Sequence, residues 1–224
     1  MRRLWRENSL SIVFLGLFAL ALVGQAYAGW HDFNNEALSH HEEKISLGRY
    51  LLSSSFGNAV MENWQSEYLQ FTLYILLTVW FVQKGSPESK QLGKQGRESD
   101  REQLVGEHAR ADSPAWARAR GLRLWIYSSS LVLVMGTIWL SSWFAQSVTG
   151  WSDFSSEQLV HDEPALSYWQ FLGTARFWES TLQNWQSEFL AVGSMAVLAI
   201  YLRQRGSPES KPVGARHSAT GTEG

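Results

Sequence analysis

The longest uncharged stretch of the chain is residues 124–152, which read LWIYSSSLVLVMGTIWLSSWFAQSVTGWS. At about 1.5 Å per helical residue, it is long enough to cross a hydrocarbon layer of about 30 Å. A second uncharged stretch, of 23 residues, lies between Glu7 and His31. These two stretches predict an integral membrane protein, although the mean hydropathy of the whole chain is only −0.20.

Two shorter uncharged stretches lie at 68–83 and 189–202. As helices, their 16 and 14 residues would cover only about 24 Å and about 21 Å. They can cross a membrane only if their helices begin earlier and carry Glu67 and Glu188 into its outer boundary. The alternative is that they do not cross.

The positive charges distinguish between these alternatives. Of the 19 Lys and Arg residues, 16 lie in the amino-terminal tail, in 84–123 or in the carboxyl-terminal tail. The segments 29–66 and 150–187 hold the other three, against five acidic residues each. Because cytoplasmic loops are enriched in Lys and Arg, all four stretches are predicted to cross, with both termini and the central loop in the cytoplasm. The predicted crossings are 8–28, 58–83, 124–146 and 179–203.

Residues 1–28 also fit a secretory signal, with a basic start, an apolar stretch and a small-x-small cleavage site at 26–28. One observation argues against cleavage. The segment before Gly150 corresponds to the segment before Gly29, and because it is internal to the chain it cannot be a signal. The sequence therefore favours a retained first helix, and mature protein that begins at Gly29 would contradict it.

The chain repeats itself with an offset of 121 residues. Residues 29–90 align with 150–211 without a gap, and 25 of the 62 positions are identical. Such similarity indicates duplication. Because each unit contains two crossings, both copies enter the membrane from the same side, as parallel repeats related by a pseudo-twofold axis along the membrane normal. The predicted fold is all-α and integral to the membrane, with four transmembrane helices formed by tandem duplication of a two-helix unit.

The repeat divides the chain into four segments. They are a first two-helix membrane repeat over 1–90, a hydrophilic cytoplasmic linker over 91–123, a second two-helix membrane repeat over 124–211 and a disordered tail over 212–224. Within the linker, 91–113 is rich in Gly, Gln and charge, which predicts disorder or loose helix. The following 115–123 is a candidate short helix that can lie against anionic headgroups, although a solvated spacer with flanking anchors is the favoured interpretation. In the outer loops, 47–56 and 168–178 are predicted to lie on the membrane surface.

Several short motifs occur along the chain: Arg-Glu-Asn-Ser-Leu-Ser at 6–11, Gly-Gln at 24–25, Ser-Leu-Gly-Arg-Tyr-Leu at 46–51, Asn-Trp-x-Ser-Glu at 63–67 and Gly-Ser-x-Glu-Ser-Lys at 85–90. Together they resemble a bacterial family of uncharacterised small integral membrane proteins, known as a domain of unknown function. The resemblance implies placement in the bacterial inner membrane. It carries over no activity, ligand or catalytic residue.

The motif Asn-Trp-Gln-Ser-Glu stands at the head of both short stretches. On a helix its Asn and Glu are four residues apart and share a face, with the Ser beside them. A carboxylate in hydrocarbon costs on the order of 2.5–3.5 kcal/mol at the bilayer centre, so it faces protein, water or a partner. Two such faces related by a twofold axis would place Glu67 and Glu188 across one polar cavity, where paired carboxylates share a proton or coordinate a cation. The candidate polar site is Asn63, Gln65, Ser66, Glu67, Asn184, Gln186, Ser187 and Glu188.

The same residues also fit a structural role. Polar side chains of transmembrane helices hydrogen-bond to neighbouring helices, at about 0.6 kcal/mol per contact on average. In a variant of this role, each Glu lies at headgroup level beside a Trp that anchors the helix. The sequence favours these structural interpretations over proton or cation handling.

The outer loops repeat a His-x-Glu pattern, as His40 with Glu42 and as His161 with Glu163. Their nitrogen and oxygen atoms suit zinc or another divalent ion. Because the His-Glu-x-x-His spacing is absent from the sequence and these residues lie in loops, a solvated acidic loop is the favoured interpretation.

Each copy ends with Gly-Ser-Pro-Glu-Ser-Lys, at 85–90 and at 206–211. Glycine suits a left-handed helix stop, and the preceding Lys84 and Arg205 complement the carboxyl end of a helix. Helix termination explains the Gly, the Pro and the basic residue but not the Glu and the Ser. A cytoplasmic docking sequence is the alternative.

The composition excludes several classes of function. Without Cys, the chain has no disulfide, thiolate metal cluster or Cys nucleophile. The net charge of −2 gives no reason to expect nucleic-acid binding. The sequence shows no Ser/His/Asp set, phosphate-binding Gly loop or dinucleotide fingerprint, so we expect neither enzymatic activity nor a cofactor.

We therefore expect a non-enzymatic membrane protein that acts by interaction or scaffolding. Its expected contacts are the lipid bilayer and protein partners or further copies of itself. The alternative is a small transporter or channel that handles protons or cations through the duplicated motif. A water-accessible route to Glu67 and Glu188 would favour transport, whereas burial of these residues without such a route would favour packing.

Overall fold

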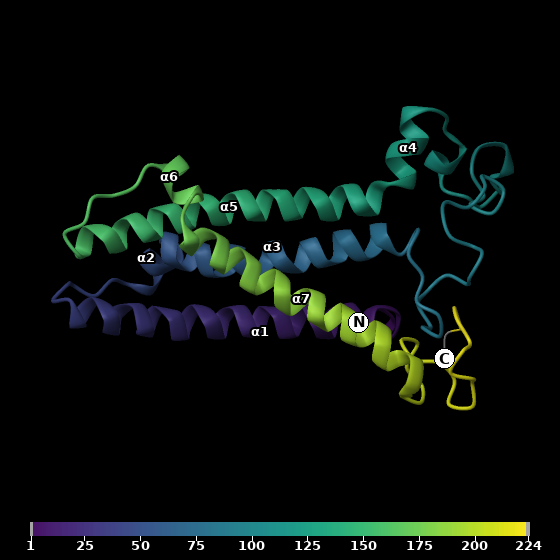
Figure 1. The fold of residues 1–224 in the computed structure, drawn as a ribbon, viewed down its shortest axis with the longest axis horizontal. Helices are drawn as coiled ribbons and strands as arrows, with labels where there is room; N and C mark the ends of the chain where they lie inside the picture. Colours follow the sequence, from purple (N-terminus) through teal and green to yellow (C-terminus); the bar gives the residue numbers. More distant parts are fainter. Residues whose placement is uncertain (1, 223–224) are drawn as a thin grey trace. The chain divides into compact units, whose positions relative to one another are not determined.

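The computed structural model of this chain describes residues 2–222. Within these residues the secondary structure is helical throughout, with seven α-helices, two short 3-10 helices and no strand (Figure 1). The predicted all-α class is confirmed.

Four of the helices are long. They are α1 (Arg2–Ser39), α3 (Ser54–Leu77), α5 (Ser130–Val160) and α7 (Ala175–Tyr201). The short ones are α2 (Leu47–Leu51), α4 (Leu122–Ser128), α6 (Tyr168–Leu172) and the 3-10 helices η1 (Gly106–His108) and η2 (Ala115–Arg118). Each predicted crossing therefore overlaps one long helix.

Two helices of the described chain, α1 from Arg3 onward and α5, are long and apolar enough to cross a membrane. The apolar side chains of α1 are exposed along most of its length: Leu10, Ile12, Val13, Phe14, Leu15, Leu17, Phe18, Leu20, Val23 and Tyr27. Consecutive residues of a helix point in different directions, so this exposure surrounds α1. A helix that is apolar on every side requires lipid or another apolar surface around it.

The third predicted crossing, 124–146, is interrupted near its start. The structure has α4 and α5 there, separated by non-helical backbone at Ser129 (φ −111°, ψ 6°). The Oγ of Ser130 donates to Tyr127 O at 2.8 Å, and such local bonds from Ser compete with helix continuation. The long helix consequently begins six residues later than the sequence predicts.

Two other predicted boundaries also differ from the structure. The crossing predicted to reach residue 83 ends as α3 at Leu77, where Thr78 Oγ1 donates at 2.8 Å to the carbonyl four residues earlier. The short helix predicted over 115–123 is divided into η2 and the start of α4. Gly121, with φ +59°, separates them because this backbone conformation cannot continue a right-handed helix.

The chain forms two compact units. The first consists of the residues up to Met61 together with Ala145–Thr174, and the second consists of Glu62–Phe144 together with the residues from Ala175 onward. Each unit therefore takes residues from both sides of the linker 91–123.

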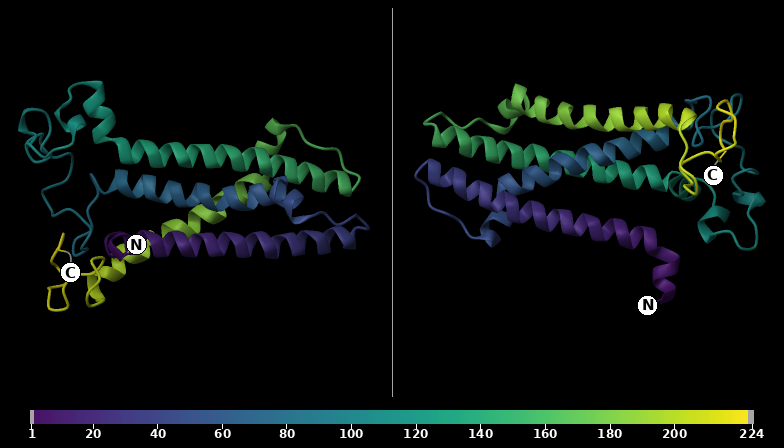
Figure 2. Two further views of the ribbon diagram at one scale, coloured as in Figure 1. Left: turned by 180° about the vertical axis from the view of Figure 1, so that it is seen from behind. Right: turned by 90° about the horizontal axis from the view of Figure 1, so that it is seen from below.

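In the first unit, the loops after α1 and α5 turn back and end in α2 and α6 (Figures 1 and 2). Trp30 Nε1 donates to Ile45 O at 2.7 Å, which ties the first loop to α1. At an offset of 121 residues, Trp151 Nε1 donates to Leu166 O, also at 2.7 Å. The segments predicted to lie on the membrane surface, 47–56 and 168–178, thus begin with the short helices α2 and α6.

Tyr50 of α2 forms the centre of a buried aromatic group in the same unit. Its ring centroid lies 5.7 Å from that of Phe33 and 5.4 Å from that of Phe56. Burial raises the pKa of the Tyr50 hydroxyl above its ordinary value, and the negative charges of Asp153 and Asp32 raise it further. The hydroxyl is therefore held in its neutral form.

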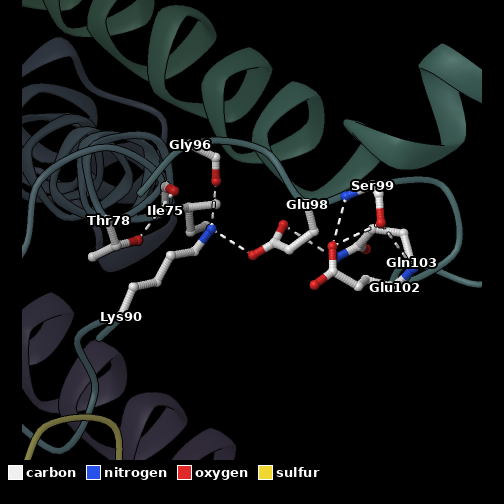
Figure 3. A network of polar contacts seen from close by, with 8 residues as sticks. All are labelled: Ile75, Thr78, Lys90, Gly96, Glu98, Ser99, Glu102 and Gln103. Carbon is white, nitrogen blue, oxygen red and sulfur yellow. Dashed lines mark hydrogen bonds and ion pairs between the residues drawn. The ribbon is translucent and has the colours of Figure 1, made fainter. Parts of the chain in front are cut away.

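In the second unit, the linker carries a local polar network (Figure 3). Lys90 Nζ donates to Gly96 O at 2.7 Å and pairs with Glu98 Oε1 at 2.5 Å. The hydrogen bond from Lys90 lowers the pKa of the Glu98 carboxyl. The N–H and hydroxyl of Ser99 donate to Glu102 Oε2 at 2.9 and 2.7 Å. The segment predicted to be disordered or loosely helical contains these turns and η1.

The two Gly-Ser-Pro-Glu-Ser-Lys segments fold alike. The Oγ of Ser89 accepts from the backbone N–H of Gln83 at 2.8 Å, and the Oγ of Ser210 accepts from that of Gln204 at 2.9 Å. The leading glycine of each segment has positive φ, +90° in the first and +85° in the second. The second serine of the motif therefore satisfies a backbone donor after the helix end, which helix termination alone did not explain.

The carboxyl-terminal tail, for which the sequence predicts disorder, makes hydrogen bonds in the second unit. Lys211 is 1% exposed, and its Nζ donates to Gly85 O at 2.6 Å and His217 O at 2.8 Å. Gly85 N–H donates to Thr220 Oγ1 at 2.8 Å. Burial of the ammonium group lowers the pKa of Lys211, and the positive charge of Arg203 lowers it further.

Candidate functional site

The Asn-Trp-Gln-Ser-Glu motif lies within α3 and again, 121 residues later, within α7. In α3, Gln65 and Ser66 are buried, with 0% and 1% of their surface exposed. Asn63 and Glu67, which flank them, are exposed. Because consecutive residues of a helix point in different directions, burial of both Gln65 and Ser66 means that two neighbouring sides of α3 face protein here.

Gln65 links α3 to α7 through its side-chain amide. Its Oε1 accepts a hydrogen bond from Trp185 Nε1 at 2.7 Å, and its Nε2 donates to Glu62 O at 3.1 Å. Both polar ends of the buried amide are therefore paired. A buried polar group that is paired in this way adds stability, whereas an unpaired one costs about 1–3 kcal/mol.

Glu62 supplies the second link between these helices. Its Oε1 accepts hydrogen bonds from Ser180 Oγ and from Asn184 Nδ2, the latter at 3.2 Å. Asn184 Nδ2 also lies 2.9 Å from Ser180 O. Glu62 lies outside the duplicated motif, and the equivalent residue in the second copy is Gln183, so the repeat gives no signal for it. Its position one turn before Gln65, on the same helix face, is the signal that would have identified it.

Ser66 Oγ donates to Asn63 O at 2.9 Å, within its own helix. Of the predicted site residues, Gln65 and Asn184 make hydrogen bonds between α3 and α7. Glu188 is half-buried and Glu67 is exposed, so the two carboxylates have different surroundings.

The contacts between the two motifs are not reciprocal. Under a twofold axis, Gln186 would pair with Trp64 as Gln65 pairs with Trp185. Gln186 is exposed instead, and so is Ser187, whose Oγ donates to the carbonyl three residues earlier in its own helix at 2.8 Å. The two copies of the motif therefore differ in burial, because α3 and α7 bury different residues of it.

Trp185 also belongs to an aromatic group that includes α5. Its ring centroid lies 5.7 Å from that of Trp143, which stacks on Trp139 at 6.1 Å with an interplanar angle of 9°. Thr181, one turn before Trp185, is fully buried. This copy of the motif Trp therefore packs between helices, where its indole N–H reaches a partner.

The histidines of the two His-x-Glu segments meet in the first unit. The rings of His40 and His161 lie 5.7 Å apart, edge to face at 69°, while Glu42 and Glu163 are exposed. Over the described part of the chain, no group of three or more His, Cys, Asp or Glu side chains is arranged to hold a metal ion. Two imidazoles supply fewer ligands than the usual four of a zinc site.

The chain belongs to the family described as Domain of unknown function (DUF6766), which matches residues 1–222. Searches of the curated proteins and of the solved structures return no match. The resemblance seen in the short motifs is confirmed in so far as it pointed to a family of unknown function.

Proposed function

We propose that this family member is a non-enzymatic bacterial inner-membrane protein that acts by interaction or scaffolding and needs no cofactor. The observation that carries the proposal is that polar side chains in and beside the duplicated motif form hydrogen bonds between α3 and α7. Gln65 bonds Trp185, and Glu62 accepts from Asn184 of the facing helix. Polar side chains paired between helices stabilise packing, which is the structural role expected of such a motif.

The proposal includes four crossings, with both termini and the linker in the cytoplasm. Support comes from α1 and α5, which are apolar enough to cross, and from the Lys and Arg distribution. In α3 and α7 the polar residues that reduce hydropathy include Gln65, Ser66 and Thr181, which are buried. A polar side chain that faces another helix need not contact lipid, so these helices can cross despite their lower hydropathy.

The proposed tandem duplication rests on the repeated sequence and on local bonds that recur at the same offset. Trp30 and Trp151 each donate to a carbonyl 15 residues later at 2.7 Å. Ser89 and Ser210 each accept from a backbone N–H six residues earlier. Recurrence of specific long-reach contacts is what two copies of one folding unit would produce.

The proposed interaction surface is α1. Its apolar side chains are exposed on every side, which exceeds what a solvated helix tolerates. Lipid covers part of this surface, and a protein partner or a second copy of this chain covers the rest. Glu7, which pairs with Arg3 at 2.8 Å, marks the polar start of the helix.

The topology can be tested by thiol labelling, because the chain has no native Cys. We expect Ser113→Cys and Gly214→Cys to react only from the cytoplasmic side, and Glu43→Cys only from the outer side. Reaction of Ser113→Cys and Glu43→Cys from the same side would refute the four-crossing topology.

Photo-crosslinking from Phe14 and Phe18, which are exposed on α1, tests the interaction surface. Crosslinks to lipid alone would refute the scaffold role.

Proton or cation transport is the second candidate, and the observation that favours it is that Glu67 and Glu188 occupy equivalent positions of the duplicated motif. The test is proton and cation flux in liposomes with the double variant Glu67→Gln, Glu188→Gln. Under the scaffold proposal the wild-type protein and this variant give equal flux. A wild-type flux that disappears in a folded double variant would replace the scaffold role by transport.

A further inference from the structure

The second unit contains a cavity of about 290 Å³ formed by α3, α7 and the two segments that follow them. It is lined by Gln70, Phe71, Tyr74, Glu88, Ala191, Val192, Met195, Ala196 and Glu209. Its volume is just below the range for small-molecule sites, which begins at about 300 Å³. The cavity is therefore large enough for a small organic group.

Most of this lining consists of pairs separated by 121 residues. The pairs are Gln70 with Ala191, Phe71 with Val192, Tyr74 with Met195, and Glu88 with Glu209. The two copies therefore present equivalent positions to one space here, as they do not at the Asn-Trp-Gln-Ser-Glu motif. Both carboxylates come from the Gly-Ser-Pro-Glu-Ser-Lys segments, whose Glu had no role in ending a helix.

Four polar side chains line the cavity: Gln70, Tyr74, Glu88 and Glu209. Tyr74 Oη donates a hydrogen bond to Glu88 Oε2, which fixes that carboxylate against α3. Glu88 and Glu209 both line the cavity. Two carboxylates that border one space favour binding of a positive charge there.

The lysine of each segment is bound elsewhere. Lys90, two residues after Glu88, donates to Gly96 O and pairs with Glu98 (Figure 3). Lys211, two residues after Glu209, donates to backbone carbonyls of the tail and of the first segment. Each segment thus directs its ammonium group to other partners and its carboxylate to the cavity.

Apart from Gln70, the remaining lining is apolar, and it indicates what kind of cation fits. Phe71, Val192 and Met195 face the cavity together with two alanines. A small metal ion needs about six oxygen ligands, so these walls would leave much of its coordination unfilled. An ammonium group on an apolar body places its charge at the carboxylates and its carbon atoms against the walls, where the Phe71 and Tyr74 rings can also attract it.

We propose that this cavity binds an ammonium group carried on a short apolar body, with Glu88 and Glu209 as its charge partners. The site lies within one unit, so it depends neither on the scaffold role nor on the number of crossings. The ammonium group can belong to a free amine or to an aminophospholipid headgroup, because both present the same cation.

The test is calorimetric titration of the full-length protein in a non-ionic detergent with hexylammonium chloride. Each hydrogen bond to a charged group contributes about 1.5–3 kcal/mol, so Glu88→Gln and Glu209→Gln should each raise Kd by about tenfold or more. The double variant should show no binding. Glu157→Gln, an exposed carboxylate of the first unit, should leave Kd unchanged.

Two further comparisons separate charge from apolar contact. 1-Hexanol, which has the same carbon chain without the charge, should bind at least tenfold more weakly than hexylammonium. Ala196→Phe should block binding by filling the apolar part while it leaves both carboxylates in place. Hexylammonium binding that persists in the folded double Gln variant, equal binding of 1-hexanol, or no binding to the wild-type protein would overturn the proposal.

The source of the ammonium group is identified by repeating the titration in nanodiscs. If the headgroup is the ligand, phosphatidylethanolamine discs should raise the apparent Kd of hexylammonium relative to phosphatidylglycerol discs, because the lipid competes for the cavity. Equal Kd values in the two discs identify a free amine as the ligand.

Discussion

The two copies of the Asn-Trp-Gln-Ser-Glu motif provide an internally controlled test of its packing role. Gln65 and Gln186 occupy the same place in identical five-residue sequences. Gln65 is fully buried and pairs with Trp185 and Glu62, whereas Gln186 is exposed. Replacing each glutamine by Ala therefore compares one change in two environments that differ in burial and hydrogen bonding.

The expected cost of Gln65→Ala follows from these contacts. Its two hydrogen bonds contribute about 0.6 kcal/mol each on the average for transmembrane helices. The change also leaves the Trp185 indole N–H without its acceptor, and an unsatisfied buried donor costs about 1–3 kcal/mol. We therefore expect the free energy of unfolding to fall by about 2 kcal/mol for Gln65→Ala. Gln186→Ala, at an exposed position, should change it by less than about 0.5 kcal/mol.

The assay is unfolding of the full-length protein by SDS in mixed micelles, followed by far-UV circular dichroism. The double-mutant cycle with Trp185→Phe isolates the pairwise contact, because Phe keeps most of the ring and removes the donor. We expect a coupling of about 1 kcal/mol between positions 65 and 185. Equal destabilisation by the two alanine variants, or zero coupling in the cycle, would refute the assignment of the first motif to helix packing.

Three further changes test other parts of the structure. Burial and two nearby carboxylates raise the pKa of Tyr50 above its unfolded value of about 10, so the stability that this residue gives below pH 10 should be lost as the pH rises through the folded pKa. Tyr50→Phe should remove this alkaline loss, and an unchanged pH profile of unfolding between pH 9 and about pH 12 in the variant would contradict the assignment. Gly85→Ala should lower the thermal unfolding temperature more than Gly206→Ala, because both have positive φ but only the Cβ at position 85 would lie 2.5 Å from the carbonyl oxygen of His217. Lys211→Met should increase amide hydrogen exchange at Thr220 and beyond, since the carbonyls that hold the tail lose their shared donor.

The sequence predicts the helices and the loops better than it predicts the contacts between them. Hydropathy and charge locate all four long helices because these signals are local to each segment. The break at Ser129 was missed, although it lies in a run of three serines at 128–130, and such a cluster favours a turn between two helical segments. Residues 124–128 consequently belong to α4 and not to the long helix that follows.

The environment of the duplicated motif could not be read from its own residues. The partner of the Gln65 amide is Trp185, and the partners of the Glu62 carboxylate are Ser180 and Asn184. All three partners lie on α7, so the residues of α3 alone do not reveal them. Position 183, the counterpart of Glu62, is Gln, so the difference between the copies lies outside the identical five residues. Only the packing of α3 on α7 decides which copy is buried.

The two duplicated motifs have consequently taken different roles. At the Asn-Trp-Gln-Ser-Glu end, the first copy buries Gln65, whereas the second copy packs through Asn184 and Trp185 and exposes Gln186, so identical sequence does not produce a shared site. At the Gly-Ser-Pro-Glu-Ser-Lys end, Glu88 and Glu209 line one cavity, and the positions beside them are also paired at the offset of 121. Because a shared site requires equivalent residues to face each other, the second end meets that requirement and the first does not. In the second motif, the Gly and the Ser already end the helix and satisfy a backbone donor after it. The presence of Glu in both copies is therefore better explained by the cavity than by helix termination.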